Sequence, residues 1–389
     1  MKKLLLPVLA SLCATAALAQ TTPTTDPNLA VPPAAAPITP PPAPTPPVAP
    51  IQSPTTAPLT TYGFVDAYYG FDFNHANTNQ RPGFLYSHNR QNEFTVNNAV
   101  IGMRYDDGKV RGALGLHAGT YVSANYAAED QVMKHIYEAY AGFRPFEKAW
   151  LDVGIFGSHI GFESAISKDN WTLTRSLMAE NSPYYESGAR FTYEVGPKLT
   201  LTGLVLNGWQ NIRETNQGKA LGTQIQWKPT DKLLINSSTF YGNEQPQDSI
   251  KRRRYFHDFY ATYAATDRLN LAVVFDVGKQ QSEGRHGYDT WHTGSAFVKY
   301  KLADKFSTTL RGEYYNADRG VIISSIMPTR TDARFLAGGT SLNLDYLPTP
   351  NVAFRIEGRY LRAQSPIFEH DNGFSQNYGN LTTSIALSF

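Results

Sequence analysis

Apolar and polar residues alternate one by one along much of the chain from about residue 61 onward. In the segment 269–277, one face of a strand would carry Leu269, Leu271, Val273, Phe275 and Val277. The segment 352–360 turns Val352, Phe354, Ile356 and Tyr360 one way, and Arg355, Glu357 and Arg359 the other. The segment 381–389 alternates in the same way and ends at Phe389. A period of two residues predicts β-strands with one apolar face.

The length of the strands and of their connections favours a transmembrane barrel over a soluble sandwich. The strands run to about 10 to 13 residues, enough to cross a bilayer when tilted. Short turns are predicted at 106–109, 145–148, 196–198, 229–232, 266–268, 303–305 and 348–350. Longer polar segments alternate with them at 74–92, 124–130, 159–183, 211–217, 243–252, 281–288, 317–332 and 364–376. These seven turns and eight loops join sixteen strands, with fourteen or eighteen as neighbouring solutions, and sixteen places both termini on one side.

The predicted fold is therefore an all-β, closed antiparallel barrel over residues 61–389, because lipid offers no partner to an unpaired strand edge. A barrel of this size encloses an aqueous lumen. Aromatic residues reach 13% of the chain, and we expect them to face lipid or form interfacial girdles. Examples are Tyr62, Tyr68, Phe73, Tyr105, Tyr263, Tyr300 and Phe389. The terminal Phe389 resembles the C-terminal aromatic assembly signal of outer-membrane barrels.

The N-terminal region differs from the rest of the chain. Residues 1–19 combine Lys2 and Lys3 with an apolar stretch and a small-residue cleavage pattern, which predicts a secretory signal peptide. Residues 20–60 hold 14 of the 25 prolines, which predicts a disordered linker, either a passive tail or a tether in the periplasm. Removing residues 1–19 leaves no cysteine, because Cys13 is the only cysteine of the chain. The remaining chain has 33 basic and 33 acidic residues. This balance argues against a nucleic-acid partner.

If the apolar face of each strand meets lipid, the polar face lines the lumen. The predicted pore-lining residues are Arg111, Arg190, Arg311, Glu313, Arg355, Glu357 and Arg359. Two interpretations remain open. Such charges select solutes by sign, or opposite charges pair across neighbouring strands and only keep the lumen hydrated.

The sequence shows no signature of a cofactor or metal site. It contains no phosphate-binding glycine loop, no dinucleotide fingerprint and no Gly-x-Ser-x-Gly elbow. Its nine histidines show no spacing typical of metal ligands. We therefore expect no enzyme, although Ser, His and acidic residues of a barrel-embedded hydrolase could still converge in space.

Several segments resemble the OmpL-like group of outer-membrane porins, also called β-barrel porins of the second type. The resemblance starts at the opening strand 62–69 and continues through His88-Asn89 and the strand 94–98. It includes the Gly-aromatic-Glu segment 161–164 and the Asn-Gly-Trp segment 207–209. It spans roughly residues 61–389 and implies an outer-membrane channel without catalytic residues.

The loop 159–183 is the third and longest of the predicted loops. In sixteen-stranded general porins the third outer loop folds inward and narrows the channel. This loop carries Trp171, Leu173, Leu177 and Met178, whose exposure to water would be unfavourable. If it folds inward, the candidate constriction residues are Glu163, Asp169, Arg175 and Glu180. The alternative is a loop outside the barrel that caps it or packs on itself.

Together these features predict an outer-membrane porin of a Gram-negative bacterium, with periplasmic termini. It would form a passive, water-filled channel for ions and small hydrophilic solutes. The expected partners are outer-membrane lipid, the barrel assembly machinery and those solutes. A homotrimer is compatible by analogy with general porins, although no segment marks an interface. The alternatives are a plugged barrel serving as adhesin or structural anchor, and a barrel-embedded hydrolase.

Overall fold

The computed structural model describes residues 58–323, 334–371 and 373–389. The predicted signal peptide 1–19 lies outside the described residues. The predicted linker 20–60 also lies outside them up to residue 57, and so do residues 324–332 of the predicted loop 317–332. The described part begins at Pro58, one residue before the first strand.

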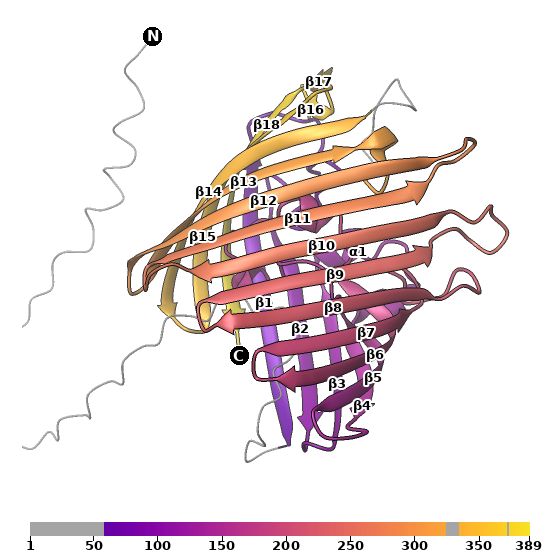
Figure 1. Ribbon diagram of the computed structural model, residues 1–389. Helices are drawn as coiled ribbons and strands as arrows, with labels where there is room; N and C mark the ends of the chain where they lie inside the picture. Colours follow the sequence, from indigo (N-terminus) through magenta and orange to yellow (C-terminus); the bar gives the residue numbers. More distant parts are fainter. Residues whose placement is uncertain (1–57, 324–333, 372) are drawn as a thin grey trace, which may run out of the picture. The chain divides into compact units, whose positions relative to one another are not determined.

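Sixteen antiparallel strands form one closed barrel (Figure 1), which confirms the predicted architecture and strand number. The first eight strands are β1 (Leu59–Asp72), β2 (Phe94–Asp106), β3 (Val110–Ala118), β4 (Ile136–Phe143), β5 (Ala149–Gly157), β6 (Tyr185–Gly196), β7 (Leu199–Leu206) and β8 (Ala220–Thr230). The others are β9 (Leu233–Asn243), β10 (Arg253–Ala264), β11 (Leu269–Gln281), β12 (Tyr288–Ala303), β13 (Phe306–Ala317), β14 (Phe335–Thr349), β15 (Val352–Ala363) and β18 (Asn377–Ser388). Each strand pairs with its neighbour in the chain, and β1 pairs with β18 to close the ring.

The remaining elements are short and lie in the connections. They are α1 (Thr120–Asn125), η1 (Met133–His135), η2 (Ser167–Asp169), α2 (Leu177–Glu180), η3 (Asp318–Gly320) and the two-stranded sheet of β16 (Phe368–His370) and β17 (Gly373–Ser375). Among the described residues, no helix has the length and apolar character needed to cross a membrane.

The connections alternate in length as predicted. The pairs β2–β3, β8–β9 and β12–β13 are joined by tight turns of a few residues, whereas β1–β2 and β5–β6 are joined by long loops. All short turns therefore lie at one end of the barrel, and β1 begins and β18 ends there. This places the first strand's start and the last strand's end on the same side, as an even strand number requires.

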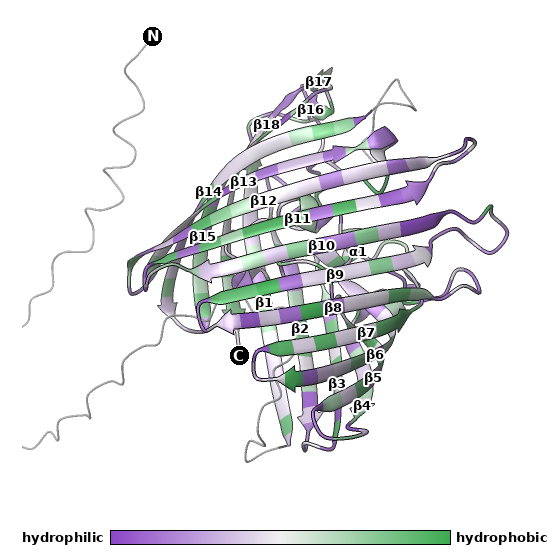
Figure 2. Cartoon of the chain, in the orientation of Figure 1, coloured by the Kyte–Doolittle hydropathy of each residue, from purple (hydrophilic) through white to green (hydrophobic). Residues whose placement is uncertain are grey.

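The two faces of the sheet differ in character, and Figure 2 shows hydrophobic and hydrophilic residues alternating along the strands. On β11, Val273, Phe275 and Val277 are exposed on the outer face, whereas Val274 and Asp276 are buried on the inner one. The outer face is therefore the apolar face, as a barrel surrounded by lipid requires.

The predicted placement of two aromatic side chains is wrong. Tyr62 and Tyr68 belong to the inner face: the Tyr62 hydroxyl donates to Glu138 at 2.5 Å, and Tyr68 is 2% exposed beside Thr120. Both faces of β1 carry aromatic residues, so alternation alone did not decide which face is which. The other predicted aromatic residues are exposed, namely Phe73, Tyr105, Tyr263, Tyr300 and Phe389.

Candidate functional site in the barrel lumen

The loop between β5 and β6 crosses the interior of the barrel. It leaves the ring at β5 and contacts β13, which is eight places away from β5 in either direction around the sixteen-strand ring. A segment that joins opposite walls can do so only through the lumen. The loop therefore folds inward, which decides between the two placements that the sequence left open.

The inward loop divides its contacts between two parts of the wall. Its apolar side chains Phe162, Trp171 and Met178 pack against Tyr260 and Phe297 from β10 and β12. Phe162 and Trp171 meet edge to face, with ring centroids 5.5 Å apart. This burial explains why a loop with so many apolar residues is stable inside the barrel.

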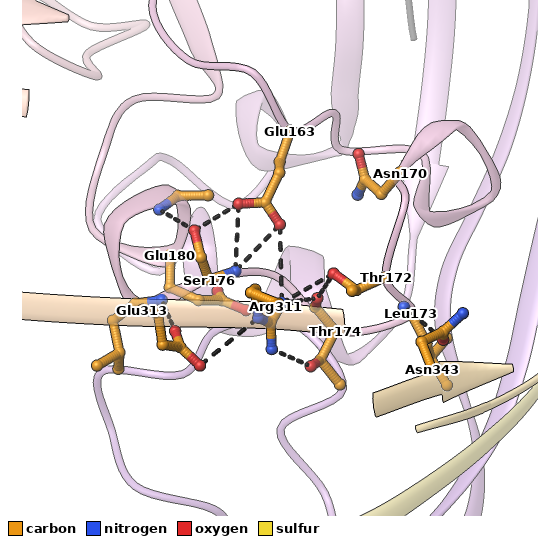
Figure 3. Close-up of polar contacts among 12 residues, drawn as sticks. Glu163, Asn170, Thr172, Leu173, Thr174, Ser176, Glu180, Arg311, Glu313 and Asn343 are labelled. Carbon is orange, nitrogen blue, oxygen red and sulfur yellow. Dashed lines mark hydrogen bonds and ion pairs between the residues drawn. The ribbon is translucent and has the colours of Figure 1, made fainter. Parts of the chain in front are cut away.

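Arg311 on β13 fixes the middle of the loop. Its guanidinium donates to the Thr172 hydroxyl at 2.9 Å and to the Thr174 carbonyl oxygen at 2.6 Å. It also lies 2.9 Å from the Glu357 carboxylate, and all of these side chains are buried. Figure 3 shows Arg311 enclosed by Glu163, Thr172 and Thr174.

The backbone of the loop is held by wall side chains that accept its N–H groups. Thr174 N–H donates to Glu357 at 2.5 Å, and Leu177 N–H donates to Glu313 at 2.7 Å. Leu173 N–H donates to the Asn343 side chain at 3.0 Å. These contacts come from β15, β13 and β14, so two carboxylates and one amide of the wall serve as acceptors for the loop.

The two remaining predicted residues on β15 are also paired. Arg355 lies 2.7 Å from Asp345, and donates to the carbonyl oxygens of Ser167 and Asn170 in the loop. Arg359 binds Glu313 through two nitrogens, at 2.8 and 2.7 Å. The wall of β13–β15 therefore carries a chain of alternating charges under the loop.

Arg111 and Arg190 form a second, separate cluster on β3 and β6. Both bind Asp152 of β5: Arg111 through two bonds of 2.7 Å, Arg190 at 2.9 Å. Their side chains are 10% and 8% exposed, so they are less covered than the arginines of β13–β15. One carboxylate shared by two guanidinium groups leaves a net positive charge on this part of the wall.

The four predicted constriction residues occupy different environments. Arg175 lies between the rings of Tyr121 and Tyr184, 4.3 and 4.0 Å from their centroids. Glu180 accepts hydrogen bonds from residues 86 and 87 of the first loop. Asp169 is exposed. Of the four, only Asp169 offers its charge to water.

Glu163 is the fourth of these residues and holds the loop together from within. Its carboxylate accepts the Ser176 N–H at 3.1 Å and the Ser176 hydroxyl, and Ser176 in turn caps α2. Burial raises the pKa of Glu163 above its usual value, although Arg311 acts in the opposite direction. The structure therefore favours the protonated carboxyl more than water does.

His159 anchors the start of the loop. Its Nδ1 lies 2.8 Å from Glu186, and its Nε2 lies 2.9 Å from the carbonyl oxygen of Thr239, which can only accept a hydrogen bond. Burial lowers the pKa of His159, but the Glu186 carboxylate and the carbonyl outweigh it, so the pKa is raised. Both ring nitrogens then donate, as in the imidazolium form.

One constellation of Ser, His and Asp does converge. Ser167 Oγ and His88 Nε2 both bind Asp66, at 2.7 and 2.9 Å. Nucleophilic catalysis requires the His between the Ser and the Asp, whereas here Asp66 lies between the other two. Within the described residues, no group of three or more His, Cys, Asp and Glu side chains is arranged to hold a metal ion.

The sequence analysis missed the acidic partners of the wall arginines. Asp152 and Asp345 lie on the inner face and bind predicted residues. Asp345 stands between the exposed Leu344 and Tyr346, so the same alternation that selected the arginines also marks it. His159 and Glu186 carried no such signal, because their contact depends on the fold of the loop.

Solved structures share this fold at low identity. OmpT of Vibrio cholerae has a TM-score of 0.56 at 10% identity over 85% of this chain and 97% of its own. An anion-selective porin from Comamonas acidovorans has a TM-score of 0.55 at 8% identity, over 85% and 99%. OmpF of Salmonella typhi, in a complex with daunomycin, has a TM-score of 0.54 at 11% identity, over 85% and 97%. No curated protein matches the chain.

A family model described as "Putative beta-barrel porin-2, OmpL-like" matches residues 58–389, which is the whole of the barrel. The match includes the segments in which the sequence resembles that group, and it agrees with the fold of the solved porins. An outer-membrane location follows from the family and the barrel. The chain is thus a member of the OmpL-like β-barrel porin-2 family of outer-membrane proteins.

Proposed function

We propose that the protein forms a passive, water-filled diffusion channel for ions and small hydrophilic solutes in the outer membrane. The observation that carries this proposal is the inward loop, which crosses from β5 to the wall at β13. A loop in this position narrows a lumen that a sixteen-strand ring would otherwise leave wide. The short-turn end, with the start of β1 and the end of β18, faces the periplasm in this proposal.

Fixed charges set the sign preference of such a channel. We assign this role to the exposed Asp169 on the loop and to the Arg111–Asp152–Arg190 cluster, whose arginines keep some exposure. The buried pairs of β13–β15 act mainly by holding the loop. Their charges influence passing ions only when the loop moves or a partner is removed.

A homotrimer is part of the proposal. One of the solved structures with this fold is described as a trimer form of Vibrio cholerae OmpT, with a TM-score of 0.54 at 9% identity. The exposed apolar outer face of the first strands, including Ile101, Leu114 and Val153, is available to lipid or to a second copy. The mass of the detergent-purified protein measures this directly.

A second function is favoured by the extent of the loop's burial. Thr172, Leu173 and Leu177 are fully buried, and Thr174 is 3% exposed. A loop packed this tightly suits a plugged barrel that acts as a structural anchor or adhesin. Conduction distinguishes this second function from an open channel.

The test is single-channel recording in planar bilayers, with the full chain purified from outer membranes. A second protein has residues 164–176 replaced by a short Gly-Ser linker. We expect steady conductance from the unmodified chain and a larger one from the shortened chain. Current only from the shortened chain supports the plugged anchor, and no current from either folded protein overturns the channel.

A further inference from the structure

A cluster of aromatic and basic side chains lies on the outer face of the barrel, near the long-loop ends of four neighbouring strands. We call it the rim patch: Tyr241 from β9, Arg253 and Tyr255 from β10, Lys279 from β11 and Tyr288 from β12. Arg253 and Lys279 are exposed, and they alternate with the buried inner residues of their strands. The patch therefore faces the surroundings of the barrel.

The side chains of the rim patch contact one another in a row. Lys279 Nζ lies 5.0 Å from the ring centroids of both Tyr255 and Tyr288. The Arg253 guanidinium lies 5.6 Å from the ring of Tyr241, whose centroid is 4.8 Å from that of Tyr255. Cation–π contacts of this kind hold both cations at the surface without neutralising them.

The two cations differ from two nearby arginines that are paired with acidic side chains. Nearby, Arg252 pairs with Glu283 at 3.0 Å, and Arg285 pairs with Asp289 at 2.5 Å. Among the described residues, neither Arg253 nor Lys279 has an acidic side chain within 4.0 Å of its nitrogens. Within the part of the chain that the structure describes, the rim patch therefore presents two positive charges outward without an acidic partner.

Next to the rim patch, the outer face carries His257 and His292 on either side of Val277, and beyond this row it becomes apolar. On the same outer face, Phe259, Phe275 and Val277 are exposed. A ligand that suits this arrangement has an anionic head at the level of the cations and acyl chains along the aromatic and aliphatic residues. Phosphate groups are suitable as the anionic head, because Lys and Arg are preferred phosphate binders.

We propose that the rim patch binds the phosphorylated glycolipid of the outer leaflet, with its phosphates on Arg253 and Lys279. The inference rests on the orientation in the proposed function, because only then do the long-loop ends reach the outer leaflet. Charge complementarity favours this lipid, because its phosphates are anionic and the rim patch carries two cations. An ordinary interfacial girdle consists of aromatic residues and requires no cations between them, whereas the rim patch contains two.

The test measures binding of bisphosphorylated lipid A by native mass spectrometry of the full chain in detergent. The variant Arg253→Ser/Lys279→Ser removes both cations. The control Lys232→Ser/Arg268→Ser removes one Lys and one Arg from short turns at the other end of the same sheet. We expect affinity to fall about fivefold for each rim cation removed, and to be unchanged in the control.

Three further comparisons decide the outcome. The charge-preserving variant Arg253→Lys/Lys279→Arg should retain binding, and lipid A without its phosphates should bind weakly to the unmodified chain. Equal binding by the serine variant, an equal loss in the control, or equal binding of phosphatidylglycerol overturns the proposal. Single-channel conductance of the serine variant should be unchanged, so failure of the lipid site and failure of the channel are separate results.

Discussion

The guanidinium of Arg311 on β13 lies 2.9 Å from the carboxylate of Glu357 on β15, with the whole of β14 between their strands. Both side chains are fully buried. They are covered by the loop segment around Thr174, to which each of them is bonded. The ion pair and the inward position of the loop therefore depend on each other.

Replacing Arg311 should release the loop. Arg311→Ala leaves Glu357 buried without its guanidinium partner, whereas Glu313 keeps Arg359. Breaking a buried pair in this way costs about 3–5 kcal/mol. We expect frequent transitions to a higher conductance level in single-channel records. Arg311→Lys should show an intermediate effect, because an ammonium cannot reproduce the forked contacts.

A matched control for this variant is Arg213→Ala. Arg213 pairs with Asp130 at 3.3 Å, but its side chain is 73% exposed. An exposed pair contributes about 0–1 kcal/mol. Conductance should not change in this control, and equal records from both variants would contradict the assigned role of Arg311.

Replacing both Arg355 and Arg359 should change the ion selectivity of the channel. In Arg355→Ser/Arg359→Ser, Asp345 and Glu313 lose their guanidinium partners, so the lumen wall becomes more negative by two charges. We expect the reversal potential in a KCl gradient to shift in the direction of greater cation selectivity. A folded double variant with an unchanged reversal potential would show that these charges do not reach the ion path.

The inward loop should lose stability as the pH rises. The pKa of His159 is raised above 6.5 by Glu186 in spite of burial. A raised pKa stabilises the folded loop at pH below about 6.5, and this stabilisation is lost as the pH rises through the folded-state pKa. The raised pKa of Glu163 acts in the same direction at lower pH.

The measurement is the open-level frequency of single channels between pH 5 and pH 9. We expect it to increase with pH in the unmodified chain. His159→Gln should already show frequent opening at pH 5 and little further change above pH 6. If the pH response is unaltered in this variant, the response belongs to another titratable group.

Removing Phe389 should reduce assembly of the barrel. Phe389 exchanges two backbone hydrogen bonds with Gly63 of β1, at 2.8 and 3.0 Å. Its deletion shortens the pairing that closes the ring and removes the terminal aromatic side chain. We expect less heat-modifiable protein in outer membranes, and near-normal amounts for Phe389→Tyr. Normal amounts of the deleted form would exclude Phe389 as an assembly signal.

The barrel could be predicted from the sequence because its outer face is a repeated local pattern. On β15, Phe354 and Ile356 are exposed while Arg355 and Glu357 are buried, as alternation indicated. Lipid imposes this pattern on every strand separately, so no knowledge of distant contacts is needed. Turn lengths then gave the strand number.

The lumen could be predicted only in part, because its contacts depend on the curvature of the whole ring. Arg311 and Glu357 meet across an intervening strand, and His159 meets Glu186 only after the loop has folded inward. On strands with a single apolar face, such as β15, alternation indicated which residues face inward. It could not identify which of them remain in contact with water after the loop covers the wall.

The closure of the ring by β1 and β18 also constrains how the protein is made. Phe64 stands opposite Ser388, and Asp66 stands opposite Ala386, so residues from the first and the last strand of the barrel must meet. No partial product can complete the ring, and each would keep two open strand edges in search of partners. Closure of the ring therefore has to wait for β18, the last barrel strand along the chain.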